Sequence, residues 1–319
     1  MTSATNRENN MSEYKVLVGD CLETMASLQD QSINCCVTSP PYFGLRDYGQ
    51  DGQIGLEASP DEFVEALVQV FREVRRVLRD DGTVWLNLGD SYARAGGWSN
   101  NNGLDGVSRH EGKRAKSNMT GAGGKSQKLP KGVKEKDLIG IPWRVAFALQ
   151  ADGWYLRQDI IWHKPNPMPE SVRDRCTKAH EYIFLLSKGP KYYYDHEAGK
   201  EPLESKKAMG DAGNEIGKRN RRSVWTVNTR PYKGAHFATF PPGLIEPCIL
   251  TGCPAGGTVL DPFGGSGTTA GVSVANNRNA VICELSEDYA ELISDRVCSI
   301  AGIQPGFDFD SPTAKVGAS

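Results

Sequence analysis

Several absences limit what this sequence of 319 residues can be. It has no apolar run long enough to cross a bilayer, and its polar first residues lack the apolar core of a secretory signal. None of its eight cysteines forms a CxxC pair, so we expect no structural metal. The net charge is only −2, which by itself indicates no particular partner. These absences predict a cytoplasmic protein with reduced cysteines and no membrane contact.

Positive charge is present, but it is concentrated in two segments rich in Gly, Ser and Asn. Residues 94–136 hold ten Lys and Arg against three acids, and residues 200–233 hold nine against four. An acidic body that carries two basic segments is typical of an enzyme that binds a polyanion. The alternative is a pair of solvated loops whose lysines only keep the protein soluble.

The order of predicted elements indicates an α/β fold. Apolar strands are expected at 15–18, 33–37 and 83–88, and the first and third are followed directly by Gly-Asp. A helix is expected from Ser59 to Gly82. Further helices are expected at 142–153 and 241–252, and strands at 154–164 and 181–188 are expected to be antiparallel neighbours. The final run predicts strand 258–261, helix 267–276, strand 280–284 and helix 286–300. Such alternation predicts a doubly wound, mostly parallel sheet with one antiparallel pair.

The glycine-rich turn 261-DPFGGSGTT-269 follows a predicted strand and opens a predicted helix. It has no lysine, which excludes a P-loop, and the spacing of its glycines does not fit a dinucleotide-binding GxGxxG motif. Glu284 ends the next strand, where a carboxylate can accept hydrogen bonds from ribose hydroxyls. The turn and this acid favour an adenosyl cofactor; the alternative is a glycine turn needed only for close packing of strand and helix.

The segment 38-TSPPY-42 places two prolines directly after an apolar strand. Proline has a fixed φ and no N–H, so the pair ends the strand and leaves rigid backbone carbonyls without ladder partners. Those carbonyls are either part of a rigid loop or acceptors for a ligand.

With both motifs, the chain resembles the S-adenosylmethionine-dependent DNA amino-methyltransferases, which modify cytosine N4 or adenine N6. The family tetrad (D/N/S)PP(Y/F) is matched by Ser39, Pro40, Pro41 and Tyr42, and DPFxGxGT is matched at 261–268. The tetrad precedes the cofactor loop, which is the circularly permuted order of the beta class. The segment 236-HFATFP-241 resembles the stretch that precedes the family's cofactor loop. The resemblance covers 15–92, 137–190 and 234–297 and implies a class I methyltransferase-like fold.

The resemblance implies S-adenosyl-L-methionine as the cofactor. The residues expected to bind it are Asp20, His236, Phe237, Thr239, Asp261, Pro262, Phe263, Gly265, Gly267, Thr268 and Glu284. Double-stranded DNA is the expected partner, contacted by a flexible insert at 94–136 and a target-recognition region at 187–233. The candidate DNA contacts are Lys164, Asn166, Lys218, Arg219, Arg221 and Arg222. A single methyltransferase domain at 15–302 lies between unstructured tails at 1–14 and 303–319.

The resemblance also implies the chemistry of the tetrad. Its carbonyls and Ser39 accept hydrogen bonds from the target amino group, and Tyr42 stacks on a base extruded from the duplex. No cysteine nucleophile is needed, and Cys248, which follows Pro247, is expected in the core. Ser39 favours N4 of cytosine, with N6 of adenine as the alternative.

Methylation of RNA or protein and a non-catalytic DNA-binding module are more distant alternatives. The resemblance places the enzyme in a bacterium or a phage. It leaves open a homodimer and a cognate restriction endonuclease as partners.

Overall fold

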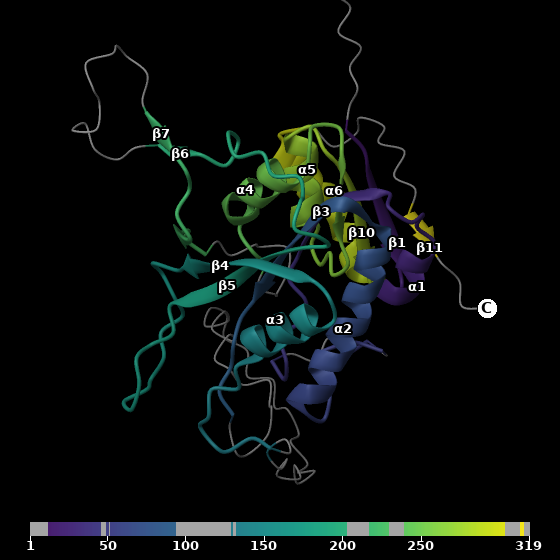
Figure 1. Cartoon of the computed structure of the whole chain (residues 1–319). Coiled ribbons are helices and arrows are strands. Elements are labelled where there is room, and N and C mark those ends of the chain that lie inside the picture. Colours follow the sequence, from purple (N-terminus) through teal and green to yellow (C-terminus); the bar gives the residue numbers. More distant parts are fainter. Residues whose placement is uncertain are drawn as a thin grey trace, which may run out of the picture.

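The computed structural model describes residues 12–45, 49–50, 52–93, 129, 132–202, 217–229, 239–303 and 313–315. Within them one sheet runs through the molecule, with helices on both faces (Figure 1). Its nine strands, in spatial order, are β11 (Thr313–Lys315), β1 (Tyr14–Val18), β10 (Asn279–Glu284), β9 (Thr258–Asp261), β2 (Ile33–Thr38), β3 (Leu78–Leu88), β5 (His180–Ser187), β4 (Tyr155–His163) and β8 (Val224–Thr226).

Strand directions confirm the predicted fold class. The first six strands in this order are mutually parallel, and β5 is antiparallel to both of its neighbours, β3 and β4. Because β3 and β4 both oppose β5, they point the same way, so the carboxyl end of β4 and the amino end of β5 meet at the carboxyl edge of the parallel strands. This edge receives the chain segments after β1, β2, β3, β9 and β10.

Two sets of helices cover the two faces of the sheet. The first set is α1 (Cys21–Ala26), α2 (Pro60–Val77) and α3 (Ile141–Ala151); the second is α4 (Pro242–Gly252), α5 (Thr268–Ala275) and α6 (Glu287–Ala301). Successive strand residues point to opposite faces, so Cys36 joins the core under α2 while its neighbour Cys35 joins the core under α4. No helix in the described segments is long and apolar enough to cross a membrane.

Helix α2 begins as predicted and ends earlier than predicted. Ser59 caps it by accepting a hydrogen bond from the Glu62 amide at 3.2 Å. The first turn holds the acids Asp61 and Glu62, and the last turn holds the bases Arg75 and Arg76. The expected end at Gly82 is wrong, because Leu78 is already extended, fully buried and paired with Ile33 of β2. Gly82 instead belongs to β3, where a Cβ would lie 2.6 Å from Leu78 Cγ.

Two strands overlap the predicted unstructured tails. Strand β1 begins at Tyr14, inside the predicted tail 1–14, and residues 1–11 lie outside the described residues. The prediction of an unstructured segment 303–319 is corrected by β11, whose Thr313 pairs with Val16 of β1. A segment of three residues is too short to carry a periodicity in its sequence.

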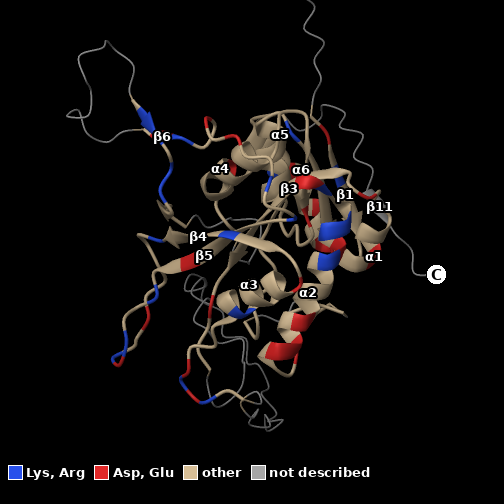
Figure 2. Cartoon of the chain, in the orientation of Figure 1, with Lys and Arg blue, Asp and Glu red and all other residues tan. Residues whose placement is uncertain are grey.

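Most of the first predicted insert, 94–128 and 130–131, lies outside the described residues, as do 203–216 and 230–233 of the second and the adjoining 234–238. The chain that leaves for the first insert and the chain that returns are joined where Tyr92 and Leu138 form an antiparallel bridge. In the second, β6 (Glu201–Pro202) and β7 (Lys218–Arg219) form a small antiparallel sheet. That small sheet stands apart from the main one and carries basic residues (Figures 1 and 2).

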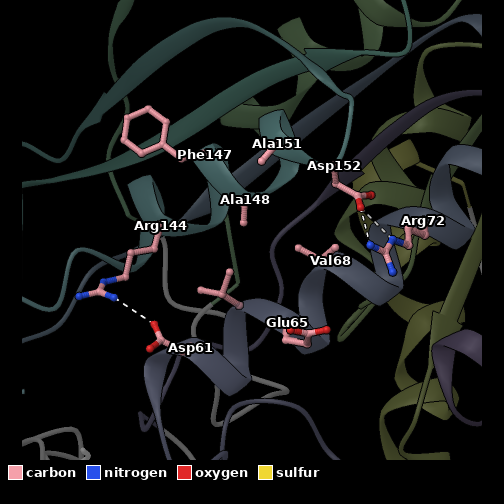
Figure 3. A pocket seen from close by; sticks show the side chains of 10 residues that line it. Asp61, Glu65, Val68, Arg72, Arg144, Phe147, Ala148, Ala151 and Asp152 are labelled. Atoms are coloured by element: carbon pink, nitrogen blue, oxygen red, sulfur yellow. Dashed lines mark hydrogen bonds and ion pairs between the residues drawn. The ribbon is translucent and has the colours of Figure 1, made fainter. Parts of the chain in front are cut away.

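A groove of about 620 Å³ lies between α2 and α3 (Figure 3). Its lining includes Val64, Val68 and Ala148, and an ion pair lies at each end, Arg144–Asp61 and Arg72–Asp152. None of the residues predicted to bind cofactor or DNA lines this groove. It is therefore separate from the site described next.

Candidate active site

The predicted cofactor loop and the predicted tetrad lie side by side at the carboxyl edge of the sheet. Strand β2, which ends at Thr38, pairs in parallel with β9, which ends at Asp261. The two segments are more than 200 residues apart in sequence, since the hydrogen bond between Thr38 and Asp261 spans 223 positions. The sheet order therefore brings together what the sequence separates.

Asp261 joins the two segments. Its buried carboxylate accepts hydrogen bonds from the Thr38 hydroxyl at 2.6 Å, the Thr269 hydroxyl at 2.6 Å and the Phe263 amide at 3.1 Å. Burial raises the pKa of Asp261 to about 6, and these three donors oppose that shift. One side chain thus ties the residue before Ser39 to both ends of the glycine-rich loop.

The glycine-rich loop presents a polar surface suited to a ligand. Gly265 and Gly267 have φ of 52° and 81°, the left-handed region that glycine adopts without strain. At Gly267 a Cβ would also lie 2.7 Å from Ile293 of α6, so only glycine lets the loop pack this closely. The buried hydroxyls of Ser266 and Thr268 have no hydrogen-bond partner among the described residues. Buried hydroxyls without partners fit a site that is completed by a polar ligand.

Glu284 ends β10, and Asp20 follows the adjacent strand β1. Glu284 is buried and accepts hydrogen bonds from the Gly265 amide at 2.7 Å and the Ser286 amide at 2.9 Å. Asp20 caps α1 by accepting from the Leu22 amide at 2.8 Å, and the Gly19 amide donates to the Glu284 carbonyl at 2.9 Å. Asp20 Oδ1 also accepts from the Glu23 amide, so its other oxygen, Oδ2, is left for a ligand, whereas each Glu284 oxygen accepts one of these bonds and keeps a lone pair for a ligand hydroxyl or amine.

The raised pKa of Glu284 predicts a pH dependence of stability. Burial raises its pKa from 4.5 to about 7, so the folded protein holds this proton more tightly than the unfolded chain does. The resulting stabilisation is complete below pH 4.5 and is lost as the pH rises to 7, about 3 kcal/mol in the free energy of unfolding. Urea unfolding without cofactor should show this fall in the wild type, relative to Glu284→Gln, between pH 4.5 and 7. Equal pH slopes for the two proteins would contradict the assignment.

The tetrad begins directly after β2. Pro40 is buried, while Ser39, Pro41 and Tyr42 are half-buried. None of the hydrogen bonds between described residues ends on the carbonyl of Ser39, Pro40 or Pro41. The Ser-Pro-Pro carbonyls thus keep the acceptor capacity that the sequence predicted.

Tyr42 is held by residues that the sequence reasoning did not identify. Its hydroxyl donates to Glu181 Oε2 at 2.6 Å, and Asn87 Nδ2 donates to the same oxygen at 3.2 Å. Its ring packs on Gly89, where a Cβ would lie 2.5 Å from ring atom Cε2. Two signals could have found this group: an Asn inside the apolar strand 83-TVWLNL-88, and an acid at the start of the strand 181-EYIFLLSK-188.

Other polar residues at this edge have structural roles. Asp90 caps α3 by accepting from the amides of Gly140 at 3.0 Å and Ile141 at 3.1 Å. The Lys178 amine donates to the Asp90 carbonyl at 2.7 Å, and burial lowers its pKa. Cys248 is buried in α4, burial raises the pKa of its thiol, and its sulfur lies against the Leu244 carbonyl. This confirms the prediction that Cys248 lies in the core.

The candidate DNA contacts all have partners within the protein or lie in the small β6–β7 sheet. Asn166 bonds the backbone of Thr229, and Lys164 forms an ion pair with Glu181. Arg221 lies over the ring of Trp225, while the guanidinium groups of two others, Arg219 and Arg222, contact Glu201. Lys218 is exposed in β7. DNA contact by these residues stays a prediction.

Two of the predicted cofactor residues, His236 and Phe237, lie outside the described residues. Thr239 lies just before α4 and is half-buried. Because α4 leads into the amino end of β9, the segment before α4 is at the carboxyl edge, where the glycine-rich loop also lies.

Comparison with known proteins identifies the family. A family model described as DNA methylase, of the N6/N4 methyltransferase type, matches residues 33–295. The chain belongs to the N6/N4 DNA methylase family. The predicted resemblance is thereby confirmed, and the methylase acts on DNA.

Relatives and solved structures agree with this assignment. The methylase is 51% identical over 291 residues to Type II methyltransferase M.SmaI of Serratia marcescens, covering 91% of this chain and 92% of that protein. It is 50% identical over 281 residues to M.Cfr9I of Citrobacter freundii, covering 88% and 86%.

Two solved structures share the fold. The PvuII DNA methyltransferase (cytosine-N4-specific) matches with a TM-score of 0.61 and 21% identity, covering 92% of this chain and 94% of that chain. The Thermus thermophilus protein TTHA0409, solved in complex with S-adenosyl-L-methionine, matches with a TM-score of 0.59 and 24% identity, covering 92% and 97%.

Proposed function

We propose that this methylase transfers a methyl group to the exocyclic N4 of cytosine in duplex DNA, at a specific sequence, after the base has been extruded from the helix. The cofactor of the family is S-adenosyl-L-methionine. The proposal is carried by one observation: a Ser-Pro-Pro segment, whose carbonyls accept no hydrogen bond from the described residues, lies beside a polar, glycine-rich loop, and Asp261 ties the two together.

The residues around the glycine-rich loop are suited to hold the cofactor. Glu284 can accept from ribose hydroxyls, and Asp20 can accept from the adenine amino group. The hydroxyls of Ser266 and Thr268 lack partners within the part of the chain that the structure describes. The cofactor would supply an electrophilic methyl group on its sulfonium. Family resemblance adds His236, Phe237 and Thr239 near the methionine end.

The tetrad prepares the amino group of the target base. The nitrogen lone pair of cytosine N4 is delocalised into the ring, so the amine is a poor nucleophile. Carbonyls of Ser39 and Pro40 that accept hydrogen bonds from both N–H groups return electron density to the nitrogen and turn its lone pair toward the cofactor side. Tyr42 offers a ring face for stacking of the extruded base. No covalent bond between base and protein is required, in keeping with the buried Cys248.

Cytosine is proposed because Ser occupies the first tetrad position. Adenine N6 is the second candidate, since the same carbonyls can accept from the adenine amino group. By analogy with relatives named Type II methyltransferases, we propose that the protein recognises a defined sequence through residues 187–233 and acts beside a cognate restriction endonuclease.

Transfer of label from methyl-tritiated cofactor tests the proposal. Wild-type protein is incubated with unmethylated duplex DNA, with RNA and with protein, and the labelled DNA is digested to nucleosides. We expect label in N4-methylcytosine. Label in N6-methyladenine would reverse the choice of base, and label only in RNA or protein would overturn the assignment of DNA as the substrate of this chain.

A further inference from the structure

The carboxylate of Glu181, at the start of β5, gathers donors from three neighbouring segments at the edge of the sheet. These are the Tyr42 hydroxyl at 2.6 Å, Asn87 Nδ2 at 3.2 Å and the Lys164 ammonium. The Glu181 side chain is only 13% exposed, so it depends on these partners for the solvation it has lost. Asn87 is itself fixed, since it also donates to the Tyr182 carbonyl at 3.0 Å.

These contacts restrict how the ring of Tyr42 can lie. The hydroxyl is held by Glu181 from β5, and the ring packs against the backbone at Gly89, just after β3. A ring held at its hydroxyl and at one edge has little freedom to turn about its side-chain torsions. A base stacks well only on a ring whose plane is already set, because ordering the ring upon binding would cost entropy.

Lys164 balances the charge of this arrangement. Its ammonium pairs with Glu181 and lies 4.2 Å from the centroid of the Trp162 ring, which is buried in β4. An unpaired carboxylate next to the tetrad would repel the phosphates of an approaching DNA strand. The pairing therefore gives Lys164 a function that differs from the direct DNA contact predicted from the sequence.

We propose that Glu181 is a positioning residue: with Lys164 as its counter-ion, it fixes the plane of the Tyr42 ring for the extruded base. This inference rests on the proposed function, because it assigns the base to the ring of Tyr42. If Glu181 only held β3, β4 and β5 together, its replacement would change the stability of the fold, and any effect on methyl transfer would not depend on Tyr42.

A double-mutant cycle separates these two roles. The variants are Glu181→Gln, Tyr42→Phe and the combination, and the measurement is single-turnover methyl transfer to duplex DNA at saturating cofactor. We expect each single variant to lower the rate roughly tenfold, the range of a hydrogen bond to a charged group. The combination should be no slower than the slower single variant, and the Kd for the cofactor should stay within about twofold of wild type.

A matched control is Asp152→Asn, which removes the charge from another ion pair, with Arg72, at the groove between α2 and α3 (Figure 3). It should leave the transfer rate unchanged. If Glu181→Gln does not fold, the rate of Tyr42→Phe alone tests the proposal, because this variant removes the donor of the same Tyr42–Glu181 hydrogen bond. A wild-type rate in Tyr42→Phe would overturn the proposal, as would a full Glu181→Gln effect in the Tyr42→Phe background.

A second measurement does not depend on activity. In protein labelled with 3-fluorotyrosine, the fluorine resonance of Tyr42 is identified by its absence from Tyr42→Phe. It should shift or broaden in Glu181→Gln and stay unchanged in Asp152→Asn. If the wild type methylates no DNA, the proposed function fails, but this resonance still tests whether Glu181 positions the Tyr42 ring. An unchanged resonance in Glu181→Gln overturns the positioning role.

Discussion

Replacement of both Ser39 and Tyr42 by alanine is expected to reduce methyl transfer to DNA at least roughly 1,000-fold, on the order of magnitude known for loss of preorganised groups that act on a reacting centre. The variant loses the side-chain oxygen beside the tetrad carbonyls and the ring on which the base stacks. Cofactor affinity should survive, because Asp261 and Glu284 hold the glycine-rich loop through their own hydrogen bonds. Titration calorimetry with the cofactor and tritium transfer to DNA measure the two effects separately.

The matched control replaces a serine and a tyrosine remote from the carboxyl edge. Ser32 precedes β2 and Tyr155 begins β4, both at the opposite edge of the sheet, and both are exposed. The variant Ser32→Ala with Tyr155→Ala should keep transfer close to the wild-type rate. Loss of cofactor binding in the Ser39→Ala, Tyr42→Ala variant would show that the tetrad and the cofactor loop are not separate sites.

Asp261→Ala is expected to have the second largest effect, on stability and on cofactor binding together. Without the carboxylate, the buried hydroxyls of Thr38 and Thr269 and the Phe263 amide lose their acceptor. Leaving buried donors unsatisfied costs about 1–3 kcal/mol each, so a loss of at least about 3 kcal/mol in the free energy of unfolding is expected. Because the same bonds shape the glycine-rich loop, cofactor affinity should fall roughly 100-fold, which is about 3 kcal/mol.

Asp261→Asn distinguishes the contribution of the hydrogen-bonding side chain at position 261 from that of its negative charge. The amide keeps one acceptor oxygen, and the Thr269 hydroxyl can turn to accept from the new NH₂ group, so the loss of stability should be about 1 kcal/mol. Asp30→Ala is the control, because that carboxylate pairs with Arg76 at the surface and its side chain is 73% exposed. Urea unfolding and calorimetry are the measurements; an Asp261→Ala variant as stable as Asp30→Ala would refute the structural role of Asp261.

The sequence was sufficient to predict the elements of regular structure that carry strong periodicity. The start of α2 and the run from β9 to α6 lie within one residue of their predicted bounds, because caps, glycines and apolar spacing act locally. The end of α2 was misplaced because burial of Leu78 against Ile33, a contact between distant segments, overrides the helical preference of its neighbours. Strand β11 escaped prediction because a strand of three residues is too short to show a periodicity.

By itself, the sequence determined the fold class, the family and the two motifs, because these are written in consecutive residues such as TSPPY and DPFGGSGTT. Only the tertiary structure decided what lies next to them. The parallel pairing of β2 with β9 places Thr38 on Asp261, and the reversed direction of β5 carries Glu181 to the same edge, against Tyr42. Contacts of this kind depend on the order and direction of strands in the sheet, which no local stretch of sequence encodes.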